Sequence, residues 1–340
     1  MSLASEVTSA PSINAIRRPV MSTLDLVGDT PLVYLERFSE SVNLRVYAKL
    51  ESFNVGGSIK DRAAHRMILQ ALAVGRIGRQ TIVVESSSGN LGVGLARICK
   101  FLGLRFVCVV DPNISPQKLS LIQAYGGEIS AVRERDPDTG EFLPARLTRV
   151  RQLLDAWPNS FWPNQYGNLD NAGAHHRTME EIVSALEGRI DYLFCATSSC
   201  GTLRGCADYL RANKLRVAVI AVDSEASNIF GPSSGCRRLP GMGAALRPEL
   251  FDAESALACV RVSDVDCIRG CRRLAASDAI LVGGSSGGVI AAISAIASGL
   301  PSRATCVAIL PDAGDHYLDT IYSDPWITKH YGVDPAGISR

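Results

Sequence analysis

The sequence predicts an α/β fold with two lobes of parallel sheet flanked by helices, and three observations lead to this prediction. Short apolar runs rich in β-branched residues alternate along the chain with segments that carry apolar residues at helical spacing. These runs are continuous, as in strands that are buried on both faces of a parallel sheet. The chain has 340 residues, of which 46% are hydrophobic, which is enough for two lobes that each have a core.

The alternating pattern can be followed along most of the chain. The expected strands are 81–85, 105–110, 191–196, 217–222, 280–284 and 305–310, and the expected helices are 91–103, one from about 202, and one that follows the last glycines of 280–284 and runs through 298. Residues 1–22 are expected to be a loose tail, and residues 226–247 a long irregular segment. Because ligands bind at the carboxyl ends of strands in open parallel sheets, functional residues are expected in the loops after these strands.

Composition narrows the class of protein. The net charge is +1 and no block of like charges occurs, so neither a nucleic acid nor a membrane surface is an expected partner. No apolar run approaches the roughly 18 residues of a membrane span, and the first twenty residues lack a signal-peptide core. We therefore expect a soluble, cytoplasmic protein. The ten cysteines form no C-x-x-C pair, which favours reduced core residues over a metal site.

The segment NVGGSIKDR, residues 54–62, carries a lysine at an unusual place. Two glycines and a serine precede Lys60, which begins an expected helix. A positive charge in the first turn is unfavourable for the helix dipole, which favours anions there. Lys60 is therefore either a surface lysine beside a turn or a lysine with a chemical role.

Two further loops have sequences suited to binding anions. ESSSGNLG, residues 85–92, joins a strand to a helix and contains three serines, more than an N-terminal helix cap requires. TSSCGTLRG, residues 197–205, offers hydroxyls and glycines at a helix N-terminus, where phosphate can bind. The second loop lacks the Walker pattern, so a phosphate on a cofactor fits it better than a nucleoside triphosphate.

A fourth loop, GGSSGG at residues 283–288, is also expected between a strand and a helix. A serine hydroxyl at this position can face a ring nitrogen. Its central residues also bear a partial likeness to the nucleophile elbow of serine hydrolases, with His316 available as a base. A hydrolase is therefore an alternative.

In this order and at these distances, the four motifs resemble the cysteine synthase and cystathionine β-synthase family. LVGDTPLV, residues 26–33, is similar to the opening motif of that family, and the resemblance extends from about Thr23 to Trp326. It implies a fold-type II pyridoxal-phosphate enzyme with tryptophan synthase β-like architecture. The implied organisation is a tail at 1–22, an N-terminal lobe at 48–163, and a C-terminal lobe made of 23–47 and 164–330.

The resemblance also implies roles for particular residues. Lys60 corresponds to the Schiff-base lysine, Asn90 to the residue that binds the pyridoxal 3′-oxygen, and Ser285 to the hydroxyl that faces the pyridine nitrogen. The substrate α-carboxylate would be bound by Ser87, Ser88 and Gly89, and the cofactor phosphate by Ser198, Ser199, Cys200, Gly201 and Thr202. The implied reaction is a β-replacement, in which Lys60 removes the α-proton of a serine derivative before a second nucleophile adds at the β-carbon.

Several departures from ordinary cysteine synthases point to a subgroup. Leu91 replaces a threonine, the phosphate loop reads S-S-C-G-T, and residues 109–129 replace the usual M-S-x-E-R segment. These features are similar to enzymes that build 2,3-diaminopropionate for siderophores and antibiotics. That similarity implies O-phospho-L-serine and L-glutamate as substrates, with substrate contacts at Arg146, Tyr166 and Ser198. Arg146 could alternatively be a solvated helix arginine.

Three other interpretations are possible. In an O-acetylserine or O-phosphoserine sulfhydrylase, sulfide would be the nucleophile. A catalytically silent binding module on this fold is disfavoured by the presence of Lys60, Asn90 and Ser285. A heme-regulated cystathionine synthase is disfavoured because no regulatory domain follows residue 330 and no cysteine-based heme motif occurs at the start. The family resemblance implies a homodimer that acts on small amino acids.

Overall fold

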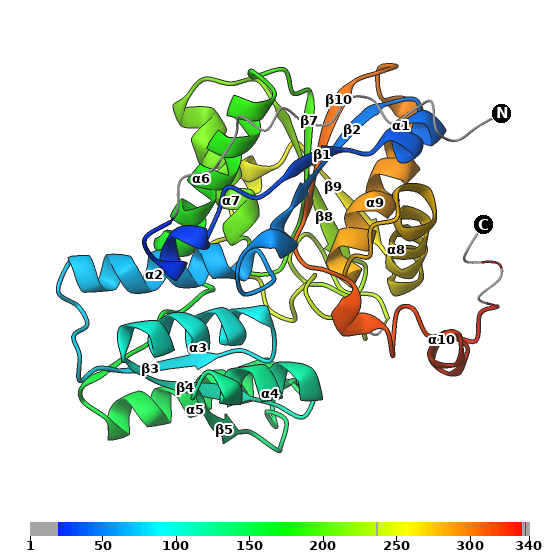
Figure 1. Cartoon of the computed structure of the whole chain (residues 1–340). Coiled ribbons are helices and arrows are strands. Elements are labelled where there is room, and N and C mark those ends of the chain that lie inside the picture. Colours follow the sequence, from blue (N-terminus) through cyan, green and yellow to red (C-terminus); the bar gives the residue numbers. More distant parts are fainter. Residues whose placement is uncertain (1–19, 236, 335–336, 338–340) are drawn as a thin grey trace.

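The computed structural model describes residues 20–235, 237–334 and 337, and in it two separate sheets form the framework (Figure 1). The larger sheet has the strand order β1-β2-β10-β7-β8-β9 and the smaller sheet the order β5-β4-β3-β6. Only the β1–β2 pair is antiparallel among the paired strands of the described residues. The strands are β1 Leu32–Tyr34, β2 Arg45–Leu50, β3 Ile82–Ser86, β4 Arg105–Val110, β5 Glu128–Ala131, β6 Ser160–Phe161, β7 Tyr192–Ala196, β8 Ala218–Ser224, β9 Ala258–Val262 and β10 Thr305–Leu310.

Helices cover both faces of each sheet. They are α1 Glu36–Val42, α2 Lys60–Ala73, α3 Asn90–Leu102, α4 Pro116–Ala124, α5 Phe142–Ala156, α6 Leu169–Ala185, α7 Gly201–Ala212, α8 Asp264–Asp278, α9 Gly284–Ile296 and α10 Asp324–Tyr331. On the larger sheet, α1, α8 and α9 share a core with one face and α6 and α7 with the other. On the smaller sheet, α2, α3 and α4 cover one face and α5 the other. The predicted α/β class with parallel sheets flanked by helices is confirmed.

The continuous apolar runs are explained by this double covering. In β10, Cys306, Ala308 and Leu310 pack under α8 and α9, whereas Val307 and Ile309 pack under α6 and α7. Every residue of β10 is buried, because alternate side chains enter two different cores.

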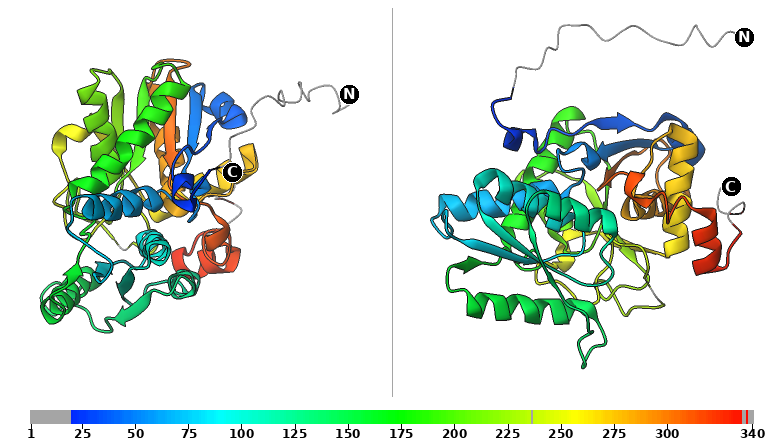
Figure 2. Two further views of the ribbon diagram at one scale, coloured as in Figure 1. Left: turned by 60° about the vertical axis from the view of Figure 1, so that its left-hand side comes forward. Right: turned by 60° about the horizontal axis from the view of Figure 1, so that its bottom comes forward.

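The helix α2 lies where the parts built on the two sheets meet (Figures 1 and 2). It packs against α3 of the smaller sheet and against α6 of the larger one. The four-stranded sheet, at residues 82–161, falls inside the proposed lobe 48–163. However, β2 belongs to the larger sheet and crosses the proposed boundary at residue 48. The division into lobes stays a proposal, and most of the proposed tail at 1–22 lies outside the described residues.

The strand predicted at 280–284 is wrong. Val282 forms only an isolated antiparallel bridge with Ala313, and α9 already begins at Gly284. The preceding helix α8 ends at Ala279 in a left-handed conformation, so few residues separate the two helices. The edge position beside β8 is taken by β9, a strand that the sequence pattern did not reveal. The other predicted strands are confirmed to within two residues at each end.

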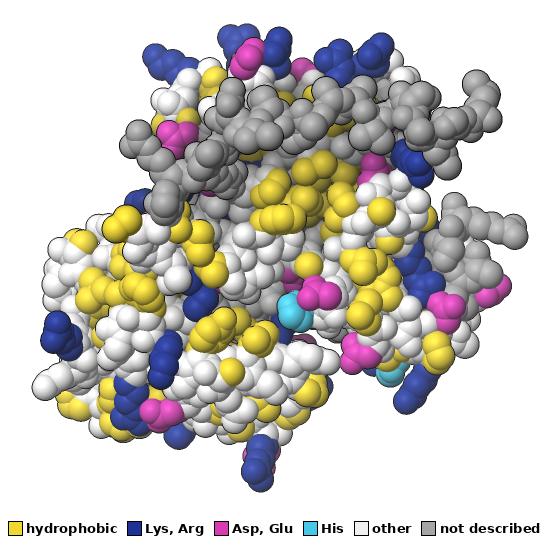
Figure 3. All heavy atoms as spheres, viewed as in Figure 1, with side chains coloured by type: hydrophobic (Ala, Val, Ile, Leu, Met, Phe, Trp, Pro, Cys, Tyr) yellow, Lys and Arg dark blue, Asp and Glu magenta, His cyan; other side chains and the backbone are white. Residues whose placement is uncertain are grey.

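The segment 226–247 forms neither helix nor strand in the residues described there, as predicted. In the described part of the chain, no helix is both long and apolar enough to cross a membrane. On the face shown in Figure 3, Lys and Arg side chains are spread among Asp and Glu side chains and do not gather in one patch.

Candidate active site

The four motif loops all lead into the N-terminal ends of helices. Helix α2 begins at Lys60, α3 at Asn90, α7 at Gly201 and α9 at Gly284. The first N–H groups of a helix have no partner within the helix and, with the helix dipole, favour bound anions. The loops before α3 and α7 follow the carboxyl ends of β3 and β7, as the sheet rule predicts.

Lys60 is held close to the end of β10. The N–H of Ile59 donates to Pro311 O at 2.9 Å, and Ser58 forms an isolated antiparallel bridge with Asp312. Burial lowers the pKa of Lys60, while neighbouring Cys200 and Asp312 oppose this effect. A buried amine with a lowered pKa is a better nucleophile at neutral pH than a surface lysine. The alternative of a surface lysine is therefore not supported.

Within the loop between β3 and α3, the hydroxyls have different partners. Ser87 Oγ accepts hydrogen bonds from the N–H of Gly92 at 3.0 Å and of Gly89 at 3.3 Å, so Ser87 shapes the loop. Ser88 Oγ accepts from Arg146 Nη1 at 2.9 Å. Asn90 Nδ2 donates to Asp312 Oδ2 at 2.8 Å. Ser88 and Asn90 thus connect this loop to two other parts of the chain.

Arg146 extends from α5 to this loop and is not a solvated helix arginine. Its Nε lies 3.1 Å from Asp111 Oδ2, and its side chain is 11% exposed. The guanidinium therefore forms an ion pair with Asp111 through Nε and donates to Ser88 through Nη1, which places a held positive charge beside Ser88.

Tyr166 and Glu85 lie near the same arginine. Burial raises the pKa of Tyr166, and the charge of Arg146 lowers it, so the phenol is neutral at physiological pH. Burial raises the pKa of Glu85 to about 7, although hydrogen bonds from Trp162 and from the Ser86 N–H oppose the shift. Glu85 is the penultimate residue of β3 and was not predicted as a site residue.

The phosphate-binding candidates surround the start of α7. Cys200 has a left-handed backbone conformation, with φ of 64°, directly before Gly201. Ser199 Oγ accepts from Asn171 Nδ2 at 3.2 Å, and Thr202 Oγ1 lies 3.2 Å from His175 Nε2. These contacts fix the two hydroxyls at the amino end of the helix, where a phosphate group would bind.

Ser198 and Ser285 both lie beside the loop 241–243. Ser198 Oγ donates to Gly243 O at 3.2 Å, and a Cβ at Gly241 would lie 3.4 Å from Ser285 Oγ. Ser285 is buried in the first turn of α9. Ser198 thus contacts the loop 241–243, whereas Arg146 contacts Ser88, and the charge of Arg146 acts on Tyr166.

The hydrolase alternative lacks its geometry. The nucleophile elbow requires a strand that turns sharply into a helix, but residues 280–283 form no strand. The hydroxyl of Ser286 is buried without a hydrogen-bond partner in the described residues. His316 instead lies near Asp315, with 4.0 Å between Nε2 and Oδ2.

Asp312 was missed by the sequence prediction, although it joins three of the four motifs. It bridges to Ser58 through the backbone, accepts from Asn90, and its carbonyl accepts from the Gly283 N–H at 3.2 Å. The sequence does contain a signal for Asp312 as a site residue, because Asp312 follows the carboxyl end of the predicted strand 305–310.

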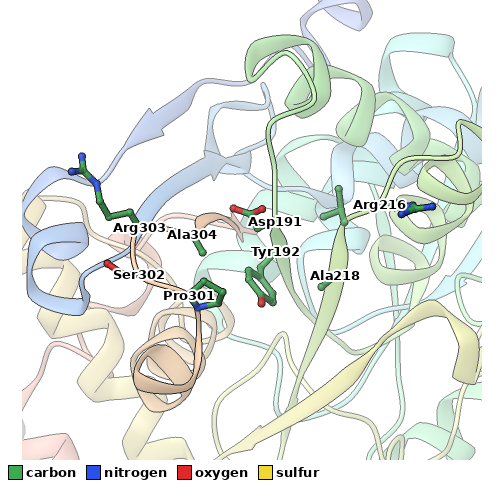
Figure 4. Close-up of a pocket in the computed structure, with 9 residues that line it drawn as sticks. Asp191, Tyr192, Arg216, Ala218, Pro301, Ser302, Arg303 and Ala304 are labelled. Carbon is green, nitrogen blue, oxygen red and sulfur yellow. The ribbon is translucent and has the colours of Figure 1, made fainter.

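A surface depression marks the opposite end of the larger sheet (Figure 4). It is lined at the amino ends of β7, β8 and β10 by residues that include Asp191, Arg216 and Arg303. The motif loops lie at the other end of these strands, so this depression is separate from the candidate active site.

Comparisons with known proteins agree with this geometry. A family model of pyridoxal-phosphate dependent enzymes matches residues 23–312. The chain is 42% identical over 309 residues to an N-(2-amino-2-carboxyethyl)-L-glutamate synthase of Ralstonia nicotianae, and the match covers 91% of each sequence. Among solved structures, a cysteine synthase from Entamoeba histolytica is 30% identical with a TM-score of 0.85, over 92% of this chain and 94% of that one. An O-acetylserine dependent cystathionine β-synthase from Helicobacter pylori is 29% identical with a TM-score of 0.83, over 90% and 99%.

The chain therefore belongs to the family of pyridoxal-phosphate dependent enzymes, and within it to the cysteine synthase-like enzymes that carry out β-replacement. The described residues fit pyridoxal phosphate. Lys60, an amine with a lowered pKa, begins α2, and the amino end of α7 has the form of an anion-binding site. Among the described residues, the Nδ2 group of Asn90 donates to Asp312 alone, which leaves its second N–H for a ligand.

Proposed function

We propose that this enzyme replaces the phosphate of O-phospho-L-serine with the amino group of L-glutamate. The products would be N-(2-amino-2-carboxyethyl)-L-glutamate and phosphate, and the first would be a precursor of 2,3-diaminopropionate for siderophore synthesis. The observation that carries the proposal is the largely buried guanidinium of Arg146, which lies beside Ser88. The name of the Ralstonia relative supports the same product.

The argument from Arg146 is electrostatic. Both proposed substrates carry several negative charges, and an arginine binds carboxylate or phosphate through paired, charge-assisted hydrogen bonds. Asp111 holds the guanidinium in place through Nε, and Nη1 lies beside Ser88 in the loop proposed to bind the substrate carboxylate. Sulfide, the nucleophile of a cysteine synthase, is too small to use such a group.

The residues near the cofactor have separate proposed roles. Bound pyridoxal phosphate would supply an electron sink for the α-carbon of the substrate. Lys60 would hold the cofactor and then move the α-proton, while Asn90 and Ser285 would orient its ring. The cofactor phosphate would be bound by Ser198, Ser199, Cys200, Gly201 and Thr202, and the substrate α-carboxylate by Ser87, Ser88 and Gly89.

Phosphate release tests the proposal. The purified holoenzyme is incubated with O-phospho-L-serine and either L-glutamate or sulfide, and O-acetyl-L-serine is used as a matched first substrate. We expect release of phosphate that depends on glutamate. Fast release that needs sulfide and does not respond to glutamate would contradict the proposal and indicate a sulfhydrylase.

We further propose that the enzyme acts in the cytoplasm as a homodimer, on the basis of the family resemblance. Analytical ultracentrifugation of the holoenzyme tests the oligomeric state, and a single species with the mass of one chain would contradict it.

A further inference from the structure

Four side chains, of which those of Asp312, Tyr317 and Lys118 are buried and that of Asn90 is half-buried, form a continuous contact from one sheet to the other near Lys60. Asp312 Oδ2 accepts hydrogen bonds from Asn90 Nδ2 at 2.8 Å and from the Tyr317 hydroxyl at 2.7 Å. Lys118 Nζ donates to the same hydroxyl at 3.3 Å. Asn90 and Lys118 come from helices of the smaller sheet, whereas Asp312 and Tyr317 follow β10 of the larger one. The set therefore connects both halves of the site.

The position of Asp312 is fixed by its backbone as well. It pairs with Ser58, and its carbonyl accepts from the Gly283 N–H. A Cβ at Gly283 would lie 2.1 Å from Asp312 Oδ1, so only glycine fits there. The carboxylate is thus held at a constant place relative to the loops that carry Lys60 and Ser285.

The carboxylate determines which way the Asn90 amide points. An ionised carboxylate can only accept hydrogen bonds, so the Nδ2 end of the amide has to face it. One N–H of Nδ2 is used in this contact, and the second N–H remains for a ligand. Without Asp312, the amide could rotate and present its oxygen instead.

Asp312 also supplies charge. Its Oδ1 is buried and has no hydrogen-bond partner in the described residues, and burial of such an oxygen is costly unless a donor or a cation lies near it. The titratable and charged groups that surround Lys60 and Asp312 are Asp61, Arg62, Lys118, His175, Cys200, Cys271 and Tyr317.

Most of these neighbours carry no negative charge at neutral pH. Burial raises the pKa of Cys200 and of Cys271 to about 12, and it lowers the pKa of His175 well below its usual value. Asp61 points to the Gly56 N–H and to Arg97. Among the groups named, Asp312 is therefore the anion whose charge raises the pKa of Lys60, and its backbone bridge to Ser58 holds it near that lysine.

We propose that Asp312 is a positioning residue of the cofactor site. It fixes the amide of Asn90 and acts as the counter-charge of the Lys60 nitrogen, and Lys118 holds it through Tyr317. The inference rests on the roles proposed for Lys60 and Asn90, but not on the identity of either substrate.

Two variants separate the effect of the negative charge of Asp312 from the effect of its hydrogen bond with Asn90. Asp312→Asn keeps an oxygen that can accept from Asn90 but removes the charge. In this holoenzyme, the cofactor bound to Lys60 is expected to lose its proton at a pH lower by about 1 unit or more, seen in its visible absorbance. Asp312→Ala removes both, and we expect roughly tenfold weaker binding of pyridoxal phosphate to the apoprotein, measured by fluorescence titration.

The other two residues provide independent variants. Tyr317→Phe and Lys118→Met leave the backbone pairing of Asp312 untouched, and each is expected to weaken cofactor binding, by less than Asp312→Ala. Asp315→Asn is the matched control, because Asp315 lies three residues away and its side chain is 65% exposed. It should change neither the titration nor the affinity.

An unchanged absorbance titration in Asp312→Asn together with wild-type affinity in Asp312→Ala would overturn the inference. If these variants do not fold, wild-type behaviour of both Tyr317→Phe and Lys118→Met overturns it. A failure of the proposed function would give another result. If the wild-type enzyme binds the cofactor and shows its normal absorbance but does not consume glutamate, only the proposed substrates are contradicted.

Discussion

At the scale of the residue, the site depends on a few side chains whose surroundings change their chemistry. Desolvation lowers the pKa of Lys60, and Asp111 and Ser88 hold the guanidinium of Arg146 in place. In both cases the neighbours of a residue type that is common on protein surfaces suit it to the role that we propose for it.

The role of Lys60 can be tested by its removal. Lys60→Ala is expected to abolish the visible absorbance of the cofactor bound to the protein, because no other amine would form the covalent link. Lys100→Ala, an exposed lysine on α3, is the control. Persistence of the absorbance in Lys60→Ala would show that the assignment is wrong.

The role of Arg146 can be tested by substrate affinity. Arg146→Gln is expected to raise the KM for the anionic substrates by roughly 10- to 100-fold, since charge-assisted hydrogen bonds contribute about 1.5–3 kcal/mol. The cofactor spectrum should not change. Arg149→Gln on the same helix, where Arg149 bonds Ser130, is the control.

Arg146→Gln also leaves Asp111 buried without its ion-pair partner, which could destabilise the fold. The double variant Arg146→Gln with Asp111→Asn removes both charges and should have the same high KM. A KM equal to that of the wild type in either variant contradicts a substrate role for Arg146.

At the scale of the element, the site is a set of helix N-termini that close packing holds together. Helices α8 and α9 approach so closely that a Cβ at Gly270 would lie 2.0 Å from Gly287 O. Because Ser285 lies in the first turn of α9, this glycine contact determines where that hydroxyl is placed.

Gly270→Ala tests the importance of this contact. The added methyl group has to push the two helices apart, and such overpacking costs about 1–3 kcal/mol. We expect a melting temperature lower by several degrees, measured by calorimetry. Gly299→Ala is the control, since a Cβ there meets no atom within 4 Å. Equal melting temperatures for both variants would contradict the packing argument.

The elements differ in how well the sequence predicts them. The strands β4 and β10 and the polar loops before α3 and α7 were predicted because their signals are local: a buried apolar run followed by glycines and hydroxyls. The apolar run at 280–284 has the same local signal, yet the chain lacks the length to form a strand between α8 and α9. The positions of the neighbouring helices therefore override the local strand signal at 280–284.

At the scale of the whole molecule, contacts between distant parts of the chain complete the site. Asp312 meets Asn90 because β10 lies in the middle of the larger sheet, and Arg146 meets Ser88 because α5 covers the smaller one. The sequence separations of these pairs are 222 and 58 residues. No local pattern reports such pairs, so Arg146 was predicted only by resemblance and Asp312 was not predicted.

The central claim is that glutamate nitrogen replaces the phosphate of O-phosphoserine. The most direct test is the product mass after the holoenzyme reacts O-phospho-L-serine with ¹⁵N-labelled L-glutamate. We predict one product that contains both carbon skeletons and the label, with a secondary amine joining them. Phosphate with unlabelled pyruvate and ammonia as the only products, and glutamate unconsumed, would contradict this claim.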